Sequence, residues 1–83
     1  MKILYFARFR QVIGRASDDI KVPAGIATVE DLLNHLIATD ANCAAAFADR
    51  KIIRVAVNQS HVKMDHSLVG ATEVAFFPPV TGG

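Results

Sequence analysis

Five short stretches of the chain predict β-strands, because they are rich in aliphatic and aromatic residues or alternate apolar with polar positions. They cover residues 2–7, 18–22, 52–58, 61–64 and 73–77. In the first stretch Ile3 and Tyr5 share one face, and Leu4 and Phe6 share the other. Apolar residues on both faces indicate a strand in the middle of a sheet.

The clearest helical pattern begins at Thr28, a favourable N-cap that has Asp31 three residues later. The following apolar residues recur with the period of one helix face, at Val29, Leu32, Leu33, Leu36 and Ile37. Residues 8–13 predict a helical turn that Gly14 ends, and the alanine-rich residues 41–49 predict a second short helix. The chain therefore has one dominant amphipathic helix between its strands.

Strands before and after one main helix predict an α+β fold, in which the helix packs on a mixed sheet. The order β-β-α-β-β is that of the ubiquitin-like β-grasp. We assign residues 1–77 to this single domain. Residues 78–83 follow as a flexible, extended C-terminal tail, because Pro78 and Pro79 cannot donate ladder hydrogen bonds and so end the last strand.

Length and charge narrow the possible functions. The 83 residues fit one small domain, which has little room for a deep cavity of its own, so a function that needs a large pocket would require a partner. The formal net charge is +1, without the basic excess expected of a nucleic-acid-binding protein. The basic residues are scattered along the sequence, and we interpret them as solvated surface. These basic residues include Arg8, Arg10, Arg15, Lys51 and Arg54.

The single cysteine and the N-terminal residues suggest a cellular compartment. Cys43 has no second cysteine with which to form an intramolecular disulfide, and we interpret it as a small buried hydrophobic residue. Arg8 and Arg10 interrupt the apolar N-terminal run, which is too short for a signal sequence or a membrane span. These features predict a cytoplasmic protein with no membrane partner.

Side-chain catalysis has little support in the sequence. His35, His61 and His66 lack the spacing of a metal site, so we predict no metal and interpret them as surface residues. Cys43 has no identifiable base nearby, and no glycine-rich loop predicts a nucleotide site. The C-terminal residues are the remaining candidate for chemistry.

The tail consists of Pro78, Pro79, Val80, Thr81, Gly82 and Gly83. Six residues can extend about 20 Å, at roughly 3.3 Å per residue. The prolines favour an extended start, and the two glycines make the tip thin enough to enter a narrow channel on another protein. The carboxylate of Gly83 is a poor electrophile, so it would need activation, for example adenylation by a separate ATP-using enzyme.

The last eleven residues, EVAFFPPVTGG, closely resemble the signature of the small, sulfur-carrying subunit of molybdopterin synthase. KILYFARFRQVIG at 2–14, TVEDLLNHL at 28–36 and RVAVNQ at 54–59 resemble the opening strand and turn, the main helix and the third strand of that family. Two departures are Ala71-Thr72, where relatives usually have Gly-Asp, and His61, where relatives usually have an apolar residue.

The resemblance implies a specific reaction sequence. An E1-like enzyme adenylates Gly83, and a sulfur donor protein converts it to a thiocarboxylate. The tail then enters the large synthase subunit, and the sulfur passes to cyclic pyranopterin monophosphate in molybdenum cofactor biosynthesis. The family's synthase is a heterotetramer, and the small subunit alone is not expected to turn over substrate. No tightly bound cofactor is expected on this chain.

Strand alternation also predicts a docking residue. Val74 and Phe76 face one side of the last strand and Phe77 faces the other, so Phe77 would be exposed beside the tail if the helix covers Val74 and Phe76. We predict that Phe77 anchors the partners. If His61 flanks the same surface, it alters the affinity for them or makes that affinity depend on pH. The alternative interpretation is that Phe77 is an ordinary core residue.

Three other functions remain open at this point. The chain could carry sulfur for another pathway, such as thiamine synthesis, although the FFPPV run argues against it. It could be a ubiquitin-like modifier that is joined to lysines through Gly83. It could also be an interaction module whose function does not depend on Gly82 and Gly83.

Overall fold

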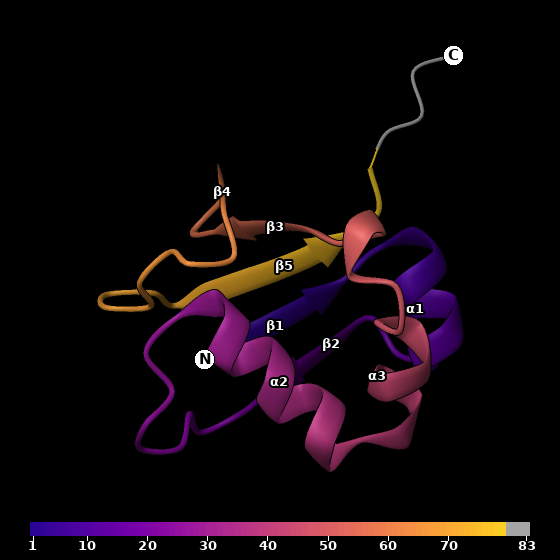
Figure 1. Ribbon diagram of the computed structural model, residues 1–83, viewed down its shortest axis with the longest axis horizontal. Helices are drawn as coiled ribbons and strands as arrows, with labels where there is room; N and C mark the ends of the chain where they lie inside the picture. Colours follow the sequence, from indigo (N-terminus) through magenta and orange to yellow (C-terminus); the bar gives the residue numbers. More distant parts are fainter. Residues whose placement is uncertain (80–83) are drawn as a thin grey trace.

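In the computed structural model, which describes residues 1–79, five strands form one mixed sheet (Figure 1). The strands are β1 (Lys2–Tyr5), β2 (Ser17–Asp19), β3 (Arg54–Val57), β4 (Ser60–Val62) and β5 (Glu73–Phe77). Their order across the sheet is β2-β1-β5-β3-β4. The central pair, β1 and β5, is parallel, and the other neighbours are antiparallel. This is the α+β, ubiquitin-like β-grasp arrangement that the pattern predicts.

The register brings three strand ends together. Tyr5 at the end of β1 pairs with Phe76 near the end of β5, and Arg54 at the start of β3 pairs with Phe77. We call this end of the sheet, where β1 and β5 end and β3 begins, the tail edge. The chain leaves the sheet here through Pro78 and Pro79 (Figure 1).

Helices cover one face of the sheet (Figure 1). They are α1 (Ala7–Ile13), α2 (Val29–Thr39) and α3 (Ala41–Ala46), followed by the 3-10 helix η1 (Arg50–Ile52). The core lies between this layer and the inner face of the sheet. Its largest fully buried side chains are Tyr5, Phe9, Phe47, Phe76, Ile3, Leu32, Leu33, Val29, Val74 and Cys43.

The main helix begins at the predicted residue. Thr28 accepts a hydrogen bond from the Asp31 N–H at 3.2 Å, and the Asp31 carboxylate accepts one from the Thr28 N–H at 3.1 Å. This reciprocal pair is a capping box. Because it fixes where α2 begins, it also determines which helix face meets the sheet, and Leu32, Leu33 and Leu36 are buried there.

Several predicted boundaries are wrong by a few residues. The first strand was predicted to reach residue 7, but it ends at Tyr5 because Ala7 has a φ of 51° and turns the chain into α1. Residues 50–52 form η1, so the strand predicted over 52–58 begins only at Arg54. The helix predicted over 41–49 stops at Ala46. The strands predicted over 18–22 and 61–64 are Ser17–Asp19 and Ser60–Val62.

Phe47 ties the helical layer to the sheet. Its ring centroid lies 5.0 Å from that of Phe9 in α1 and 5.2 Å from that of Phe76 in β5. The ring centroid of Tyr5 in β1 lies 6.3 Å from that of Phe47. Aromatic contacts of this kind, made by fully buried rings, hold both central strands against the helices and so fix the position of the tail edge.

Candidate functional site

The predicted tail begins at the middle of the sheet. β5 ends at Phe77, as predicted, and Pro78 and Pro79 are half-buried with no strand pairing. Val80, Thr81, Gly82 and Gly83 lie outside the described residues. The tail therefore starts from a strand that is hydrogen-bonded on both sides, to β1 and to β3, which gives it a rigid base.

The predicted docking residues, Phe77 and His61, are neighbours in the structure. Phe76 is fully buried beneath the helices, and Phe77 points to the opposite face, as alternation predicts. The ring centroids of His61 and Phe77 are 5.1 Å apart. Phe77 is half-buried, so it is less exposed beside the tail than predicted. His61, on the edge strand β4, is exposed.

A shallow hollow of about 400 Å³ lies beside these two rings. Its lining comes from β3, β4, β5 and the first residues of the tail: Arg54, Val55, His61, Val62, Phe77 and Pro79. The hollow mixes apolar surface with the cationic side chain of Arg54. Such a surface can accept a side chain from a partner protein at the point where the tail leaves.

Phe6 is a further member of this surface that the sequence interpretation did not single out. Phe6 is 47% exposed, and its N–H donates a hydrogen bond of 3.1 Å to the carbonyl oxygen of Phe76. Because Tyr5 and Phe76 point inward side by side, Phe6 and Phe77 lie next to each other on the outer face. We call Phe6, His61 and Phe77 the docking patch.

The signal for Phe6 was present in the sequence but ambiguous. Alternation put Phe6 on the same face of the first strand as Leu4, and apolar residues on both faces left open which face is covered. Only the parallel pairing of β1 with β5 shows that Phe6 lies beside the tail. The turn at Ala7 then takes the chain away into α1, which leaves the Phe6 ring at the surface.

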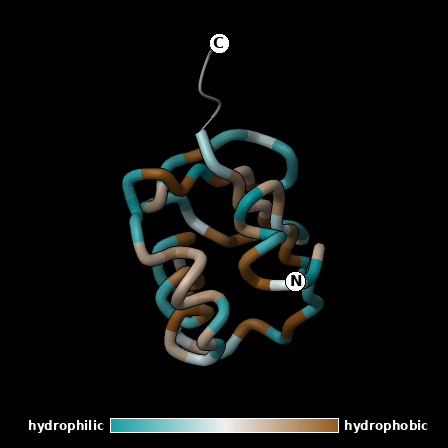
Figure 2. Tube along the Cα trace, turned by 90° about the vertical axis from the view of Figure 1, so that its right-hand side faces the viewer, coloured by the Kyte–Doolittle hydropathy of each residue, from teal (hydrophilic) through white to brown (hydrophobic). Residues whose placement is uncertain are grey.

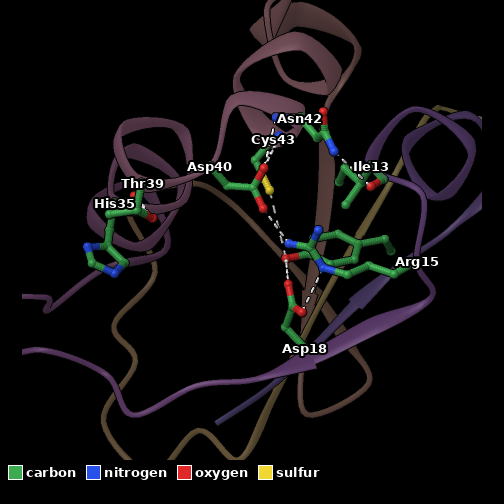
Figure 3. Close-up of polar contacts among 9 residues, drawn as sticks. Ile13, Arg15, Asp18, His35, Thr39, Asp40, Asn42 and Cys43 are labelled. Atoms are coloured by element: carbon green, nitrogen blue, oxygen red, sulfur yellow. Dashed lines mark hydrogen bonds and ion pairs between the residues drawn. The ribbon is translucent and has the colours of Figure 1, made fainter.

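A polar network lies on the helical side of the molecule (Figure 3). Arg15 donates from Nε to Asp18 Oδ1 at 2.7 Å and from Nη2 to Asp40 Oδ2 at 2.5 Å. Asp40 also caps α3 by accepting from the N–H groups of Asn42 and Cys43. The network joins the segment before β2, β2 itself and the start of α3, so it has a structural explanation.

Charges in this network shift the pKa values of their neighbours. Hydrogen bonds from Arg15 lower the pKa of Asp18 and of Asp40 below their usual values. Burial raises the pKa of the Tyr5 hydroxyl, which donates a hydrogen bond of 2.8 Å to Asp18 Oδ2. Tyr5 therefore stays protonated and neutral, as its position in the core requires.

Cys43 is fully buried, which confirms its interpretation as a small hydrophobic residue. Its sulfur lies 4.0 Å from the Tyr5 hydroxyl oxygen, and burial raises the pKa of its thiol. A raised pKa keeps the thiol protonated, whereas the thiolate is the nucleophilic form. The cysteine is thus unsuited to catalysis in this fold.

The histidines and the other candidate ligands are dispersed. His66 is exposed and His35 is half-buried. In residues 1–79 there is no group of three or more His, Cys, Asp or Glu side chains that could hold a metal ion. In the same residues no helix is long and apolar enough to cross a membrane.

The departure at Ala71-Thr72 lies at the far end of β5 from the tail. Asn58 has a φ of 48°, and its Oδ1 accepts hydrogen bonds from the N–H groups of Thr72 and Glu73 at 2.9 and 3.1 Å. The segment is therefore held by Asn58 and has no contact with the docking patch. This placement supports the interpretation that the departure alters a turn only.

The family model described as the ThiS family matches residues 3–83 of the chain. The molybdopterin synthase sulfur carrier subunit of Escherichia coli (strain K12) is 46% identical over 83 residues, which are 100% of this chain and 99% of the relative. Among solved structures, SAMP1 from Haloferax volcanii has a TM-score of 0.73 with 27% identity, covering 99% of this chain and 97% of that one. The putative molybdopterin converting factor subunit 1 from Pyrococcus furiosus has a TM-score of 0.70 with 31% identity, and 95% of each chain is covered.

These matches extend over essentially the whole chain and agree with the β-grasp topology. The chain belongs to the ThiS family of ubiquitin-like β-grasp proteins. Its identity to the Escherichia coli protein groups it, within that fold, with the sulfur carrier subunits of molybdopterin synthase. The resemblance of the last eleven residues is thereby confirmed at the level of the family.

Proposed function

We propose that this protein carries sulfur, as a thiocarboxylate on Gly83, to the large subunit of molybdopterin synthase. The observation that carries the proposal is the 46% identity over the full length of a sulfur carrier subunit, tail included. The position of the tail supports it, because the tail begins at the end of a central strand beside an apolar patch. Transfer in the proposal delivers the sulfur to cyclic pyranopterin monophosphate.

The proposed chemistry begins at the carboxylate of Gly83. Its oxygen attacks the α-phosphorus of ATP on an E1-like enzyme, pyrophosphate leaves, and an acyl adenylate forms. A persulfide sulfur on a donor protein then attacks the acyl carbon, and AMP leaves. A thiol reductant cleaves the resulting sulfur–sulfur bond, and the sulfur remains on Gly83 as the thiocarboxylate.

On the large subunit, transfer of the sulfur converts the thiocarboxylate of Gly83 back to a carboxylate. The thiocarboxylate sulfur attacks a carbon of the pterin precursor and displaces an oxygen substituent, which leaves with its electron pair. Water then attacks the acyl carbon, the acyl carbon–sulfur bond breaks, the sulfur stays on the pterin as a thiol, and the carboxylate of Gly83 is restored. A dithiolene contains two sulfurs, so two charged carriers, or one recharged carrier, are needed per product. In this proposal the large subunit supplies the pterin pocket, consistent with the shallow hollows of this small domain.

The docking patch has a defined role in this sequence of reactions. The tail of six residues reaches at most about 20 Å, so the folded domain must approach each partner closely. Phe6 and Phe77 offer apolar surface at the base of the tail, where such an approach occurs. We propose that the activating enzyme and the large subunit both bind this patch in turn, and that the synthase is a heterotetramer.

The proposal also assigns a compartment. Activation of Gly83 consumes ATP, so we place the protein in the cytoplasm, where ATP and the partner enzymes would meet it. The domain itself is proposed to hold neither a nucleotide nor a metal. It presents its own C-terminal residue to the partners, which perform the activation and the transfer.

A ubiquitin-like modifier is the second candidate. One observation favours it: a second solved structure of the Haloferax volcanii neighbour is described as small archaeal modifier protein 1, with a TM-score of 0.70 and 27% identity. Both functions begin with adenylation of a terminal glycine. They differ in the acceptor, which is sulfur for a carrier and a lysine amine for a modifier.

Intact mass spectrometry separates the two candidates. The protein is co-expressed with its host's activating enzyme and sulfur donor, purified without reductant, and compared with a variant that lacks Gly82 and Gly83. We expect one oxygen to be replaced by sulfur, with fragmentation locating the change to Gly83 and confirming that Gly83 ends the chain. Gly83 in amide linkage to lysine would instead establish a modifier, and an unmodified carboxylate with active enzyme would refute both.

A further inference from the structure

The charged side chains are unevenly distributed between the two ends of the sheet. The elements that meet at the tail edge carry five of the nine lysines and arginines of the chain. They are Arg8 and Arg10 on α1, Arg50 and Lys51 on η1, and Arg54 at the start of β3, and all five are exposed. We call these five residues the cationic collar.

The fold, and not the sequence, brings the collar together. The parallel pairing of β1 with β5 puts the start of α1 at the tail edge, and the antiparallel pairing of β3 puts Arg54 opposite Phe77. Arg54 Nη1 donates to the carbonyl oxygen of Lys51 at 3.0 Å, which joins η1 to the same edge. Figure 1 shows α1 and η1 on either side of the base of the tail, and Figure 2 shows hydrophilic stretches of chain around it. The interpretation of the basic residues as solvated surface is confirmed for Arg8, Arg10, Lys51 and Arg54, but it is wrong for Arg15, which is half-buried and paired with two carboxylates.

Little negative charge balances the collar. On these three elements and their caps, within residues 1–79, the one carboxylate is Asp49, which caps η1. At the opposite end of the sheet the charges are mixed, since Glu73 begins β5 and Asp19 pairs with Lys2. The formal net charge of +1 thus conceals a local excess of positive charge on the elements of the collar.

The fold itself makes little use of the collar. Arg8, Arg10 and Lys51 form no side-chain hydrogen bond or ion pair within residues 1–79, in contrast to Arg15, which binds two carboxylates. Like charges gathered on one surface repel one another and oppose compaction. Arg50 donates to Asn34 Oδ1 and Arg54 donates to backbone carbonyl oxygens, but within residues 1–79 no collar residue pairs with a carboxylate. A cationic cluster that costs stability and forms no internal ion pair is explained by a partner that neutralises it.

The length of the tail limits what the collar can contact. When the tail is extended, its tip lies about 20 Å from Phe77, so the collar cannot reach a phosphate or a pterin that reacts at Gly83. It must instead meet the rim of the channel that receives the tail. The adjacent apolar rings of Phe6 and Phe77 suit a protein surface better than a phosphate backbone.

We propose that the cationic collar docks on a ring of carboxylate side chains around the entrance of the channel in the large synthase subunit that receives the tail. This inference rests on the proposed function, because it requires a partner that receives the tail. Complementary charge increases the rate of association and orients the domain before the tail enters. The docking patch then supplies the short-range apolar contact.

The test uses the full-length chain and the large synthase subunit of the same host. Arg8→Gln/Lys51→Gln removes two collar charges, and Lys2→Gln/Lys21→Gln is the matched control, with two exposed charges removed away from the tail edge. Association is followed by stopped-flow fluorescence at low and high ionic strength. We expect the collar variant to associate about five- to tenfold more slowly than wild type at low salt, and the control to change by less than about twofold.

The salt dependence provides the second readout. High salt screens charges beyond a few ångströms, so the collar variant and wild type should then associate at equal rates. Equal rates for the collar variant and the control at low salt would overturn the proposal. Tighter, collar-dependent binding of the chain to a single-stranded RNA oligonucleotide than to the large subunit would overturn it too. Failure of wild type both to bind the large subunit and to acquire sulfur would refute the proposed function instead.

Discussion

Replacing Phe6 by alanine tests whether the outer face at the tail edge binds the partners. A phenylalanine side chain presents about 200 Å² when fully accessible. Phe6 is 47% exposed, so about 95 Å² remains for a partner to cover, worth about 2 kcal/mol at 25 cal/mol per Å². We therefore expect Phe6→Ala to weaken the complex with the large subunit about 30-fold.

The same reasoning ranks the members of the docking patch. Phe77 is half-buried against His61, so a partner can cover less of its surface. We expect Phe77→Ala to weaken binding by roughly 1 kcal/mol, about fivefold. The structure thus predicts a larger role for Phe6 than for Phe77, the reverse of the emphasis suggested by strand alternation in the sequence.

Isothermal titration calorimetry of the unmodified carboxylate form measures these affinities without the chemical step. Val69→Ala is the matched control, because Val69 is 92% exposed in the loop that precedes β5, away from the tail edge. Urea unfolding of each variant checks that the domain is intact: Phe6→Ala should lower the midpoint, because the other half of Phe6 is buried in the fold, and should keep one cooperative transition. A loss for Phe6→Ala of twofold or less, or equal losses for Phe6→Ala and Val69→Ala, would refute this assignment.

Three further predictions concern the fold that supports the tail. Thr28→Ala removes half of the capping box and should lower the free energy of unfolding by about 1 kcal/mol, measured in urea; an unchanged midpoint would contradict the assigned cap. Cys43 should react with a thiol reagent only at the rate of unfolding, because burial raises the pKa of its thiol; rapid labelling of the native protein would disprove this. The hydrogen bond from Arg15 lowers the pKa of Asp18 in the folded protein. The interaction between Arg15 and ionised Asp18 therefore stabilises the fold above about pH 4, the usual pKa of an unfolded aspartate, and this stabilisation is lost as the pH falls through the lower pKa of the folded state. In acid titrations followed by circular dichroism, Arg15→Gln should therefore weaken the fall in stability below about pH 4; an identical pH profile would exclude the assigned coupling.

The sequence predicted an element correctly where residues close together in the chain determine that element. The apolar period after Thr28 predicted α2, because one helix face must meet the sheet, and its capping box is formed as the residue types suggest. The prolines at 78 and 79 ended β5 at Phe77, since neither has an N–H to donate. Strand ends at Tyr5 and Arg54 were missed, because a left-handed turn at Ala7 and a short 3-10 helix leave no clear mark in the pattern.

In the candidate site, too, one part could be predicted from the sequence and another part only from the tertiary structure. The residue types of the tail, and the family they indicate, can be recognised along one continuous stretch of chain, and the full-length matches confirm that family. Phe6 and Phe77 are separated by seventy residues, and the collar residues come from α1, η1 and β3. Their proximity depends on the parallel pairing of β1 with β5 and on the antiparallel pairing of β3 with β5. Because strand pairing is a long-range property, the tertiary structure was needed to show that apolar and cationic side chains surround the base of the tail.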